Sequence, residues 1–300
     1  MPANRSRTVG WRRCLRQIKE RNGAVEIALA RNYQEAEQGH HLVWRVHLLD
    51  VRDDAILIEQ PAALGKTIPL QPGAALVVII SIGQNRWMFP TTHGGMTPHR
   101  AGDSRTVEAI RLPLPTNVQR CQRRTHYRVE TASLYLPEVE VWPLLDPKSV
   151  LVAERANELE FESAVRAASG EAPPSDPLAD SDDLMPEVGP KFAATLLNIG
   201  GGGVGIRVRP DAGGALSRHK LFWLRIALPP ELITPICASA QLVHTHLEST
   251  QDTYAGLAFD FSFNPAHQRF VADQICSYIA LQQKAMLADE VDETRQRRTA

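Results

Sequence analysis

Two short motifs in this sequence combine residue types that bind anions and bases. The first places Arg123, Arg124 and Arg128 within six residues, and the second begins at Asn198 and continues into four consecutive glycines at 200–203. Guanidinium groups bind phosphate through paired hydrogen bonds, stack on purine rings and donate to guanine O6 and N7. An asparagine amide donates and accepts at a base edge, and glycines let backbone N–H groups approach a ligand closely. Together the two motifs favour a planar, anionic ligand that carries guanine.

The order of the two motifs is more informative than either motif alone, because an arginine cluster is usually a solvated surface and a glycine run is usually a turn. The arginines follow a stiff break at Pro113 and Pro115, where each proline fixes φ, and they precede a second strand-rich unit. The glycine run joins two expected strands of that unit. We therefore expect an arginine arm that folds over the mouth of a barrel, and a ligand that fixes the angle between two domains.

Hydrophobic patterning divides the 300 residues into two strand-rich units. A basic helix is expected first, over residues 9–31. Alternating apolar residues and turn signals predict a small barrel or sandwich in the first 115 residues, with strands at 42–49, 55–59, 75–80, one ending at Phe89, and 105–112. The second unit has expected strands at 127–136, 139–145, 193–199, 204–208, 221–228, 236–247 and 254–261. A helix follows, capped by Asn264 with Pro265 at its first position.

The fold class predicted from this pattern is mainly β, with two small barrels and a C-terminal helix. The N-terminal barrel is expected to be split-barrel-like and the C-terminal one six-stranded. An acidic insertion at about 154–190 is expected to be largely disordered, because its stretch at 171–190, rich in Pro, Asp, Ser and Gly, buries too little apolar surface to offset its ordering entropy. At its start, the glutamates at 154, 158, 160 and 162 predict a short acidic helix. The predicted domains are a basic helix at 1–35, a β domain at 36–116, a linker with the arginines at 117–128, a barrel with the insertion at 129–288, and a fraying tail at 289–300.

Composition and charge argue against several functions. The 33 basic and 34 acidic residues nearly cancel, so no overall field draws the protein to nucleic acid, and we expect no nucleic-acid partner. No apolar run reaches the ~18 residues of a membrane span, so no membrane insertion is expected. The four cysteines are scattered without a CxxC pair, which indicates a reducing compartment and a cytoplasmic protein.

Other arrangements that could do chemistry are weaker. His244 and His246 share one face of an expected strand and could supply two metal ligands, but no third ligand is evident, so a surface pair is favoured and no metal is expected. The sequence has no nucleophile elbow and no phosphate-binding lysine loop. It also lacks a dinucleotide fingerprint, because no helix follows the glycines. We therefore expect neither catalytic residues nor an enzyme.

The two motifs resemble those of a known family. Residues 124–128 fit the RxxxR element of PilZ domains, and residues 198–203 fit their (D/N)xSxxG element. Residues 254–259, followed by the terminal helix, look like the end of that domain. The first unit is similar to the N-terminal domain of flagellar-brake proteins, the YcgR-like group. The resemblance covers about residues 40–285.

This resemblance implies a six-stranded PilZ barrel that binds the second messenger cyclic di-GMP and needs no other cofactor. Arg124 and Arg128 would hold its phosphates and bases, and Arg123 would assist them. Asn198 would bind a guanine edge and Gly203 would allow the turn. Binding would change the orientation of the two domains and regulate a protein partner in motility or biofilm formation; in the resembling family that partner is the flagellar motor.

One position departs from the family pattern, because Gly200 stands where the family has serine. The lost hydroxyl is worth roughly 0.5–1.5 kcal/mol if it made one ordinary hydrogen bond, which corresponds to about threefold to tenfold weaker binding. An alternative therefore stays open: a PilZ-like interaction module that has lost nucleotide binding. Nucleic-acid binding through the arginines is a third hypothesis, disfavoured by the balanced charge.

Overall fold

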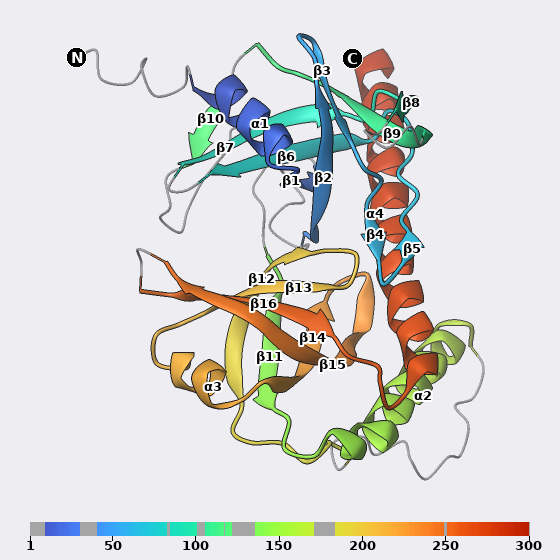
Figure 1. Ribbon diagram of the computed structural model, residues 1–300. Coiled ribbons are helices and arrows are strands. Elements are labelled where there is room, and N and C mark those ends of the chain that lie inside the picture. The colour runs from blue at the N-terminus through green and yellow to red at the C-terminus, as the bar shows by residue number, and fades with distance from the viewer. Residues whose placement is uncertain are drawn as a thin grey trace. The chain divides into compact units, whose positions relative to one another are not determined.

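The computed structural model divides the chain into two compact units (Figure 1). It describes residues 10–30, 41–82, 85–100, 106–116, 118–121, 136–170, 184–248 and 251–299. One unit, here the N-terminal unit, comprises Met1–Ala62, Thr67–Tyr135 and Ala280–Ala300. The other, here the barrel unit, comprises Ala63–Lys66 and Leu136–Ile279. Among the described residues, no helix is long and apolar enough to cross a membrane.

The N-terminal unit is built on one curled antiparallel sheet, and it contains a short helix near the start of the chain and the last part of the terminal helix. The strands at 62–63 and 66–67 form a separate two-stranded sheet. The strand order of the curled sheet is β10-β7-β6-β1-β2-β3-β9-β8. The sheet curls back on itself where the loop after β7 meets β9, because Gly94 N–H donates to Arg111 O at 2.8 Å and Arg111 N–H donates to Gly95 O at 3.0 Å. The elements are α1 (Trp11–Glu20), β1 (Ala24–Leu29), β2 (Val43–Val51), β3 (Ala55–Ile58), β4 (Ala62–Ala63), β5 (Lys66–Thr67), β6 (Ala75–Ile82), β7 (Asn85–Thr92), β8 (Met96–Arg100), β9 (Thr106–Pro113) and β10 (Gln119–Cys121).

The helix predicted over residues 9–31 is wrong in its second half. Helix α1 ends at Glu20, and β1 then pairs with both β2 and β6 in the middle of the sheet. Asn22 adopts a left-handed φ of 49°, and Gly23 N–H donates to Ile18 O at 2.7 Å, which closes the helix. Val25, which the helical spacing assigned to the helix, is buried in the strand instead.

The barrel unit is a closed six-stranded antiparallel barrel. Strand pairing runs β11-β12-β13-β16-β15-β14 and returns to β11. Most of the barrel wall therefore has no unpaired strand edge. Apolar side chains such as Val141, Ile206 and Leu224 fill the interior and are fully buried. The predicted mainly β fold with a six-stranded barrel is confirmed. The strands are β11 (Glu138–Pro143), β12 (Phe192–Ile199), β13 (Gly203–Val208), β14 (Leu221–Leu228), β15 (Leu232–Leu247) and β16 (Thr253–Phe259), with a short helix α3 (Gly213–Arg218) before β14.

The short acidic helix predicted from the glutamates at 154–162 is confirmed but is longer than predicted, so the disorder expected for the whole insertion is wrong in its first part. A 3-10 turn, η1 (Pro147–Ser149), leads into a 19-residue helix, α2 (Val150–Ala168), which packs against β15. The Asn157 amide joins the two elements, since its Nδ2 donates to Pro235 O at 2.8 Å and its Oδ1 accepts from Cys237 N–H at 3.0 Å. A stripe of buried residues, Val150, Ala153, Ala156 and Phe161, holds the helix down despite its many charges. Residues 171–183 of the insertion lie outside the described part of the chain.

The terminal helix α4 (Pro265–Thr299) begins at the predicted proline and runs through both units, which divide at Ile279. Its residues Val271, Ile275 and Tyr278 are buried, as the helical spacing predicts. The predicted fraying after residue 288 is wrong, because the helix continues to Thr299. Residues 288–299 contain neither glycine nor proline and are rich in strong helix formers.

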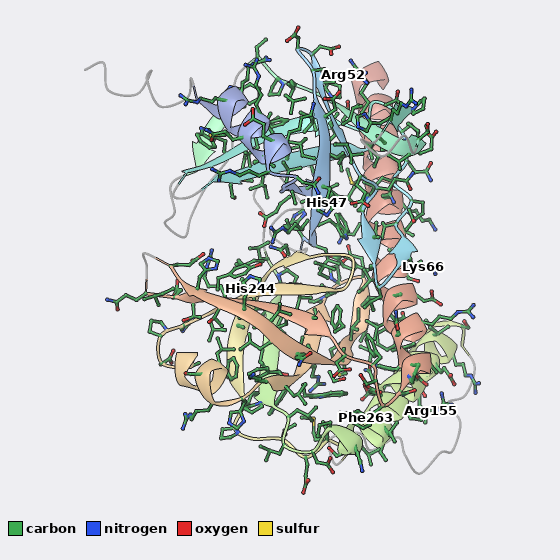
Figure 2. All side chains as sticks on the ribbon, in the orientation of Figure 1. His47, Arg52, Lys66, Arg155, His244 and Phe263 are labelled. Carbon is green, nitrogen blue, oxygen red and sulfur yellow. The ribbon has the colours of Figure 1, made fainter. Side chains whose placement is uncertain are left out.

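One carboxyl group of α2, that of Glu154, is buried. Glu154 is fully buried, and burial raises its pKa from 4.5 to about 7 despite the attraction of His267. Burial also opposes ionisation of Glu158, but its hydrogen bonds with His267 and Arg155, at 2.9 Å and 2.7 Å, outweigh burial and lower its pKa. Arg155 marks the outer side of this helix in Figure 2. The two carboxyls of one helix therefore respond to pH in opposite directions.

Glu154 should make the fold less stable as the pH rises. A raised pKa means that the folded state binds the proton more tightly, so this group's contribution is fully present below pH 4.5 and is lost as the pH rises through 7. Relative to Glu154→Gln, the free energy of unfolding of the parent protein should fall by about 2 kcal/mol between about pH 5.5 and pH 8. Urea unfolding at both pH values measures this. Glu162→Gln, at an exposed carboxyl of the same helix, is the control, and a Glu154→Gln variant with the pH dependence of that control would contradict the prediction.

Candidate functional site

The glycine turn, residues 200–203, connects β12 to β13 at one rim of the barrel. Gly200 N–H donates to Gly203 O at 2.8 Å, which closes the turn, and Phe259 N–H donates to Gly202 O at 2.9 Å, which ties it to β16. Gly201 and Gly202 are exposed and their added Cβ atoms would meet nothing within 4 Å. The turn therefore presents open backbone on its outer side.

Gly203 is required by the close approach of two strands. A Cβ at this position would lie 2.9 Å from Ala258 Cα, and closer still to Leu257 O. Both are backbone atoms of β16, which pairs with β13 at this point. The sequence predicts Gly203 as a turn residue, and the structure adds the physical reason, which is strand contact and not a left-handed φ.

Gly200 has space for a side chain. Its added Cβ would have only Gly203 O nearby, at 3.9 Å, and its φ is not in the left-handed region. A serine therefore fits at this position without displacing the turn.

Restoring that serine tests the role of the turn. Gly200→Ser is expected to leave affinity for cyclic di-GMP level or to raise it up to about tenfold, because a new hydroxyl adds at most one or two hydrogen bonds. Isothermal titration calorimetry on parent and variant measures the change. Gly201→Ser, one residue further along the open turn, is the matched control, and a large loss of affinity in Gly200→Ser alone would show that the turn does not face the ligand.

Asn198 lies beside the turn with its side chain turned over β13. The residue is 5% exposed and pairs with Gly205 across the two strands. A Cβ added to Gly205 would lie 2.8 Å from the Asn198 amide oxygen, 3.0 Å from its nitrogen and 2.6 Å from the Tyr254 hydroxyl. Gly205 thus leaves a space on the outer face of the barrel that both the Asn198 amide and the Tyr254 hydroxyl enter.

Tyr254 is flanked by two imidazole rings of the neighbouring strand. The ring of His246 stacks on it at 4.6 Å between centroids, and the ring of His244 lies 5.7 Å away (Figure 2 labels His244). His244 also covers Gly256, where an added Cβ would lie 2.8 Å and 3.0 Å from its two ring nitrogens. The described residues contain no group of three or more potential metal ligands, so this histidine pair has no third ligand there.

A short loop of the barrel unit approaches the glycine turn from another part of the sequence. Gly65 N–H donates to Gly201 O at 3.3 Å, and Leu64 O accepts from the Gln268 side chain at 3.3 Å. Lys66 forms an ion pair with Asp273 of α4 (Figure 2 labels Lys66), and that hydrogen bond raises the pKa of the lysine. Nothing in the sequence pattern predicts this contact, because it joins residues more than 130 positions apart.

The structure brings together part of the predicted site. Asn198, Gly200 and Gly203 lie on one strand-turn-strand segment, and Gly205 and Tyr254 join them. The other predicted residues, Arg123, Arg124 and Arg128, lie outside the described part of the chain, as does most of the strand predicted at 127–136. Their approach to the glycine turn stays a prediction.

Part of the N-terminal unit matches a known protein family. Residues 22–97 match the PilZNR family, whose description is flagellar protein YcgR. The match lies within the N-terminal unit. The resemblance to the YcgR-like group predicted from the sequence is confirmed by this match, and the matched segment includes β1, the strand that the sequence pattern placed in a helix.

Comparisons over the whole chain give more distant likenesses. The structure of the Bacillus subtilis inhibitor of motility MotI (DgrA) is 15% identical, covers 87% of this chain and 97% of its own, and has a TM-score of 0.29. Escherichia coli YcgR in complex with c-di-GMP is 12% identical, covers 93% and 92%, and has a TM-score of 0.26. The K. pneumonia MrkH–c-di-GMP complex is 12% identical, covers 93% and 96%, and has a TM-score of 0.28. No curated protein sequence matches the chain significantly.

Proposed function

We propose that this protein is a cyclic di-GMP receptor in which the nucleotide changes the orientation of the two domains and thereby regulates a protein partner. The observation that carries the proposal is the strand-turn-strand segment of a closed six-stranded barrel, where the Asn198 amide and the Tyr254 hydroxyl both lie over Gly205 beside an open glycine turn. A YcgR-type domain precedes this barrel in the same chain. The protein is proposed as a receptor and not as an enzyme.

The roles of the site residues follow from their chemistry. Arg124 and Arg128 bind the two phosphates and stack on the guanines, and Arg123 assists them. The Asn198 amide binds a guanine edge. Backbone N–H groups of the glycine turn approach the nucleotide, where a hydroxyl is missing at Gly200. The nucleotide acts without a metal or a second cofactor.

The proposed change in domain orientation follows because nucleotide binding would fix the arginine arm that links the two domains. A ligand shifts a conformational equilibrium only when it binds one state better than the other. Residues 119–121 of the predicted arm form strand β10, which pairs with β7, so the proposed arm is residues 122–128. If the nucleotide bridges the barrel rim and this arm, it favours the states in which the arm lies over the rim. The arm is the linker between the domains, so fixing it selects one range of domain orientations and the surface offered to a partner, for which the flagellar motor is the proposed candidate.

Titration of the full chain with cyclic di-GMP tests the proposal. We expect saturable heat and an upward thermal shift, and we expect Asn198→Ala to weaken binding about tenfold to 100-fold by removing hydrogen bonds to a base edge. Asn157→Ala, at a buried asparagine of α2, controls for loss of stability. Small-angle scattering with and without the nucleotide reports the domain orientation.

A second candidate is an interaction module that has lost nucleotide binding, and the absence of the serine hydroxyl at Gly200 favours it. No heat and no thermal shift at high micromolar cyclic di-GMP would establish this candidate over the first. A gel shift with mixed-sequence nucleic acid at about 0.15 M salt separates both from nucleic-acid binding, which is expected to be absent.

A further inference from the structure

The β15–β16 hairpin carries an unpaired strand edge. β15 pairs with β14 as far as Gln241, and Leu242 N–H donates to Lys220 O at 2.7 Å. From His244 onwards β15 keeps its pairing with β16, but no described strand pairs with its other edge. Figure 1 shows this hairpin reaching the left margin of the barrel unit. A closed barrel therefore retains one short open edge, residues 243–247.

The side chains of this edge are exposed on both of its faces. Val243 is 65% exposed and Leu247 is 72% exposed, and the residues between them are exposed as well. Natural edge strands are usually protected by lysine, proline or inward-pointing charges. Residues 241–247 contain none of these groups. The register of β15 against β16 shifts between Leu242 and His244, so the edge that is regular and open to a further strand begins at His244.

The backbone N–H groups of Thr245 and Leu247 point away from β16, toward the open side of the edge. Glu248 N–H donates to Asp252 O at 2.8 Å, which turns its N–H toward β16. Because N–H groups alternate between the two sides of a strand, the N–H groups of Leu247 and Thr245 point to the open side. The His244 ring lies over Gly256 of β16, so it does not cover the open side of the edge.

The sequence of the edge, Val243-His-Thr-His-Leu247, is complementary to itself. In an antiparallel pair of two copies centred on Thr245, that threonine faces Thr245 of the partner subunit. Val243, at the register shift of β15, then lies opposite Leu247 of the partner subunit, which brings two exposed apolar pairs together. His244 faces His246 of the partner subunit, and the edge carries no like charges that repel at neutral pH.

We infer that two copies of this chain associate through the 243–247 edge of β15, as antiparallel strands related by a two-fold axis at Thr245. The outward N–H and C=O groups of the two central threonines bond to each other, and the apolar pairs on either side shield them from water. The interface is short, which is typical of weak, reversible association. It goes beyond the proposed nucleotide receptor and is independent of it.

Sedimentation velocity of the full chain without nucleotide, from about 5 to about 500 μM, tests the association. We expect a concentration-dependent monomer–dimer equilibrium, and we expect Leu247→Lys to weaken it about tenfold or more, because two apolar pairs per dimer are replaced by buried cations. Ile233→Lys, at another exposed apolar residue of β15, is the matched control and should dimerise like the parent. A parent that stays monomeric throughout, or two lysine variants that behave alike, would overturn the inference.

A cysteine at the axis gives a second test that does not depend on affinity. In the proposed pair the two copies of Thr245 have Cα atoms about 5.5 Å apart, within the range that a disulfide spans. Thr245→Cys should therefore form a covalent dimer under a mild oxidant, whereas the parent and Ile233→Cys, which carry the same four native cysteines, should not. A Thr245→Cys protein that gives no more covalent dimer than Ile233→Cys would also overturn the inference.

Discussion

Replacing Arg124 with alanine is expected to lower the affinity of the full chain for cyclic di-GMP by about 100-fold or more, and replacing Arg128 is expected to do the same. Each guanidinium supplies several charge-assisted hydrogen bonds to phosphate or to guanine, and each such bond is worth about 1.5–3 kcal/mol. Two bonds lost at one arginine account for the expected change. Isothermal titration calorimetry measures it directly.

Alanine variants at two further arginines serve as comparisons for this loss of affinity. Arg123→Ala should cause a smaller loss, since that residue is proposed to assist. Arg166→Ala, at an exposed arginine of α2, should have no effect on affinity, so it separates a local contact from a general change in charge. Affinity that survives substitution of both Arg124 and Arg128 would place the nucleotide elsewhere. A weaker dependence of affinity on salt in the Arg124 variant would support a lost phosphate contact.

The barrel strands were predictable because their side chains alternate between core and solvent. The expected strand at 221–228 coincides with β14, where Phe222, Leu224 and Ile226 are buried and Arg225 is more exposed. Trp223 is buried as well, in a cluster with Val150 and Ala153 of α2. This period-two pattern is local to the sequence, so it requires no knowledge of the partner strands. The order of the strands around the barrel depends on long-range pairing and was predicted only through the family resemblance.

Two elements were mispredicted for a common reason. At α1 and β1, apolar residues spaced loosely at a helical period suggested one long helix, although Gly23 separates a helix from a strand. At α2, the glutamates predicted only a short helix within a largely disordered insertion, although Ala153, Ala156 and Phe161 form a buried stripe that extends the helix. In both segments, contacts with distant strands decided the structure, and composition alone does not report such contacts.

The candidate site was predicted in its first strand and turn but not across the sheet. Asn198, Gly200 and Gly203 follow from a motif that is contiguous in sequence. Gly205 and Tyr254 matter because β12, β13 and β16 bring them beside Asn198. The sequence did contain one signal for this part of the site. Gly203 and Gly205 lie two residues apart on β13, and Gly256 pairs with Gly205 from β16, so these positions contribute no side chains of their own to the outer face.

Gly203 connects the fold of the barrel to its candidate site, because it holds the end of the glycine turn against β16. The pairing of Gly203 with Ala258 brings the two backbones so close that a side chain has no space. The atoms in the way belong to the backbone of Leu257 and Ala258 and cannot rotate aside as a side chain does. An added methyl group must therefore separate β13 from β16, which breaks hydrogen bonds of the ladder and shifts the turn.

Gly203→Ala is accordingly expected to lower the free energy of unfolding by about 3 kcal/mol or more, as overpacking against backbone does when the neighbours cannot yield. Gly202→Ala is the matched control, because a Cβ there meets nothing within 4 Å and its φ is not left-handed; it should change stability by less than about 0.5 kcal/mol. Urea unfolding of both variants measures the difference. Equal stability of the two variants would show that β13 and β16 lie further apart at this point, and the turn would then be free to move independently of the barrel wall.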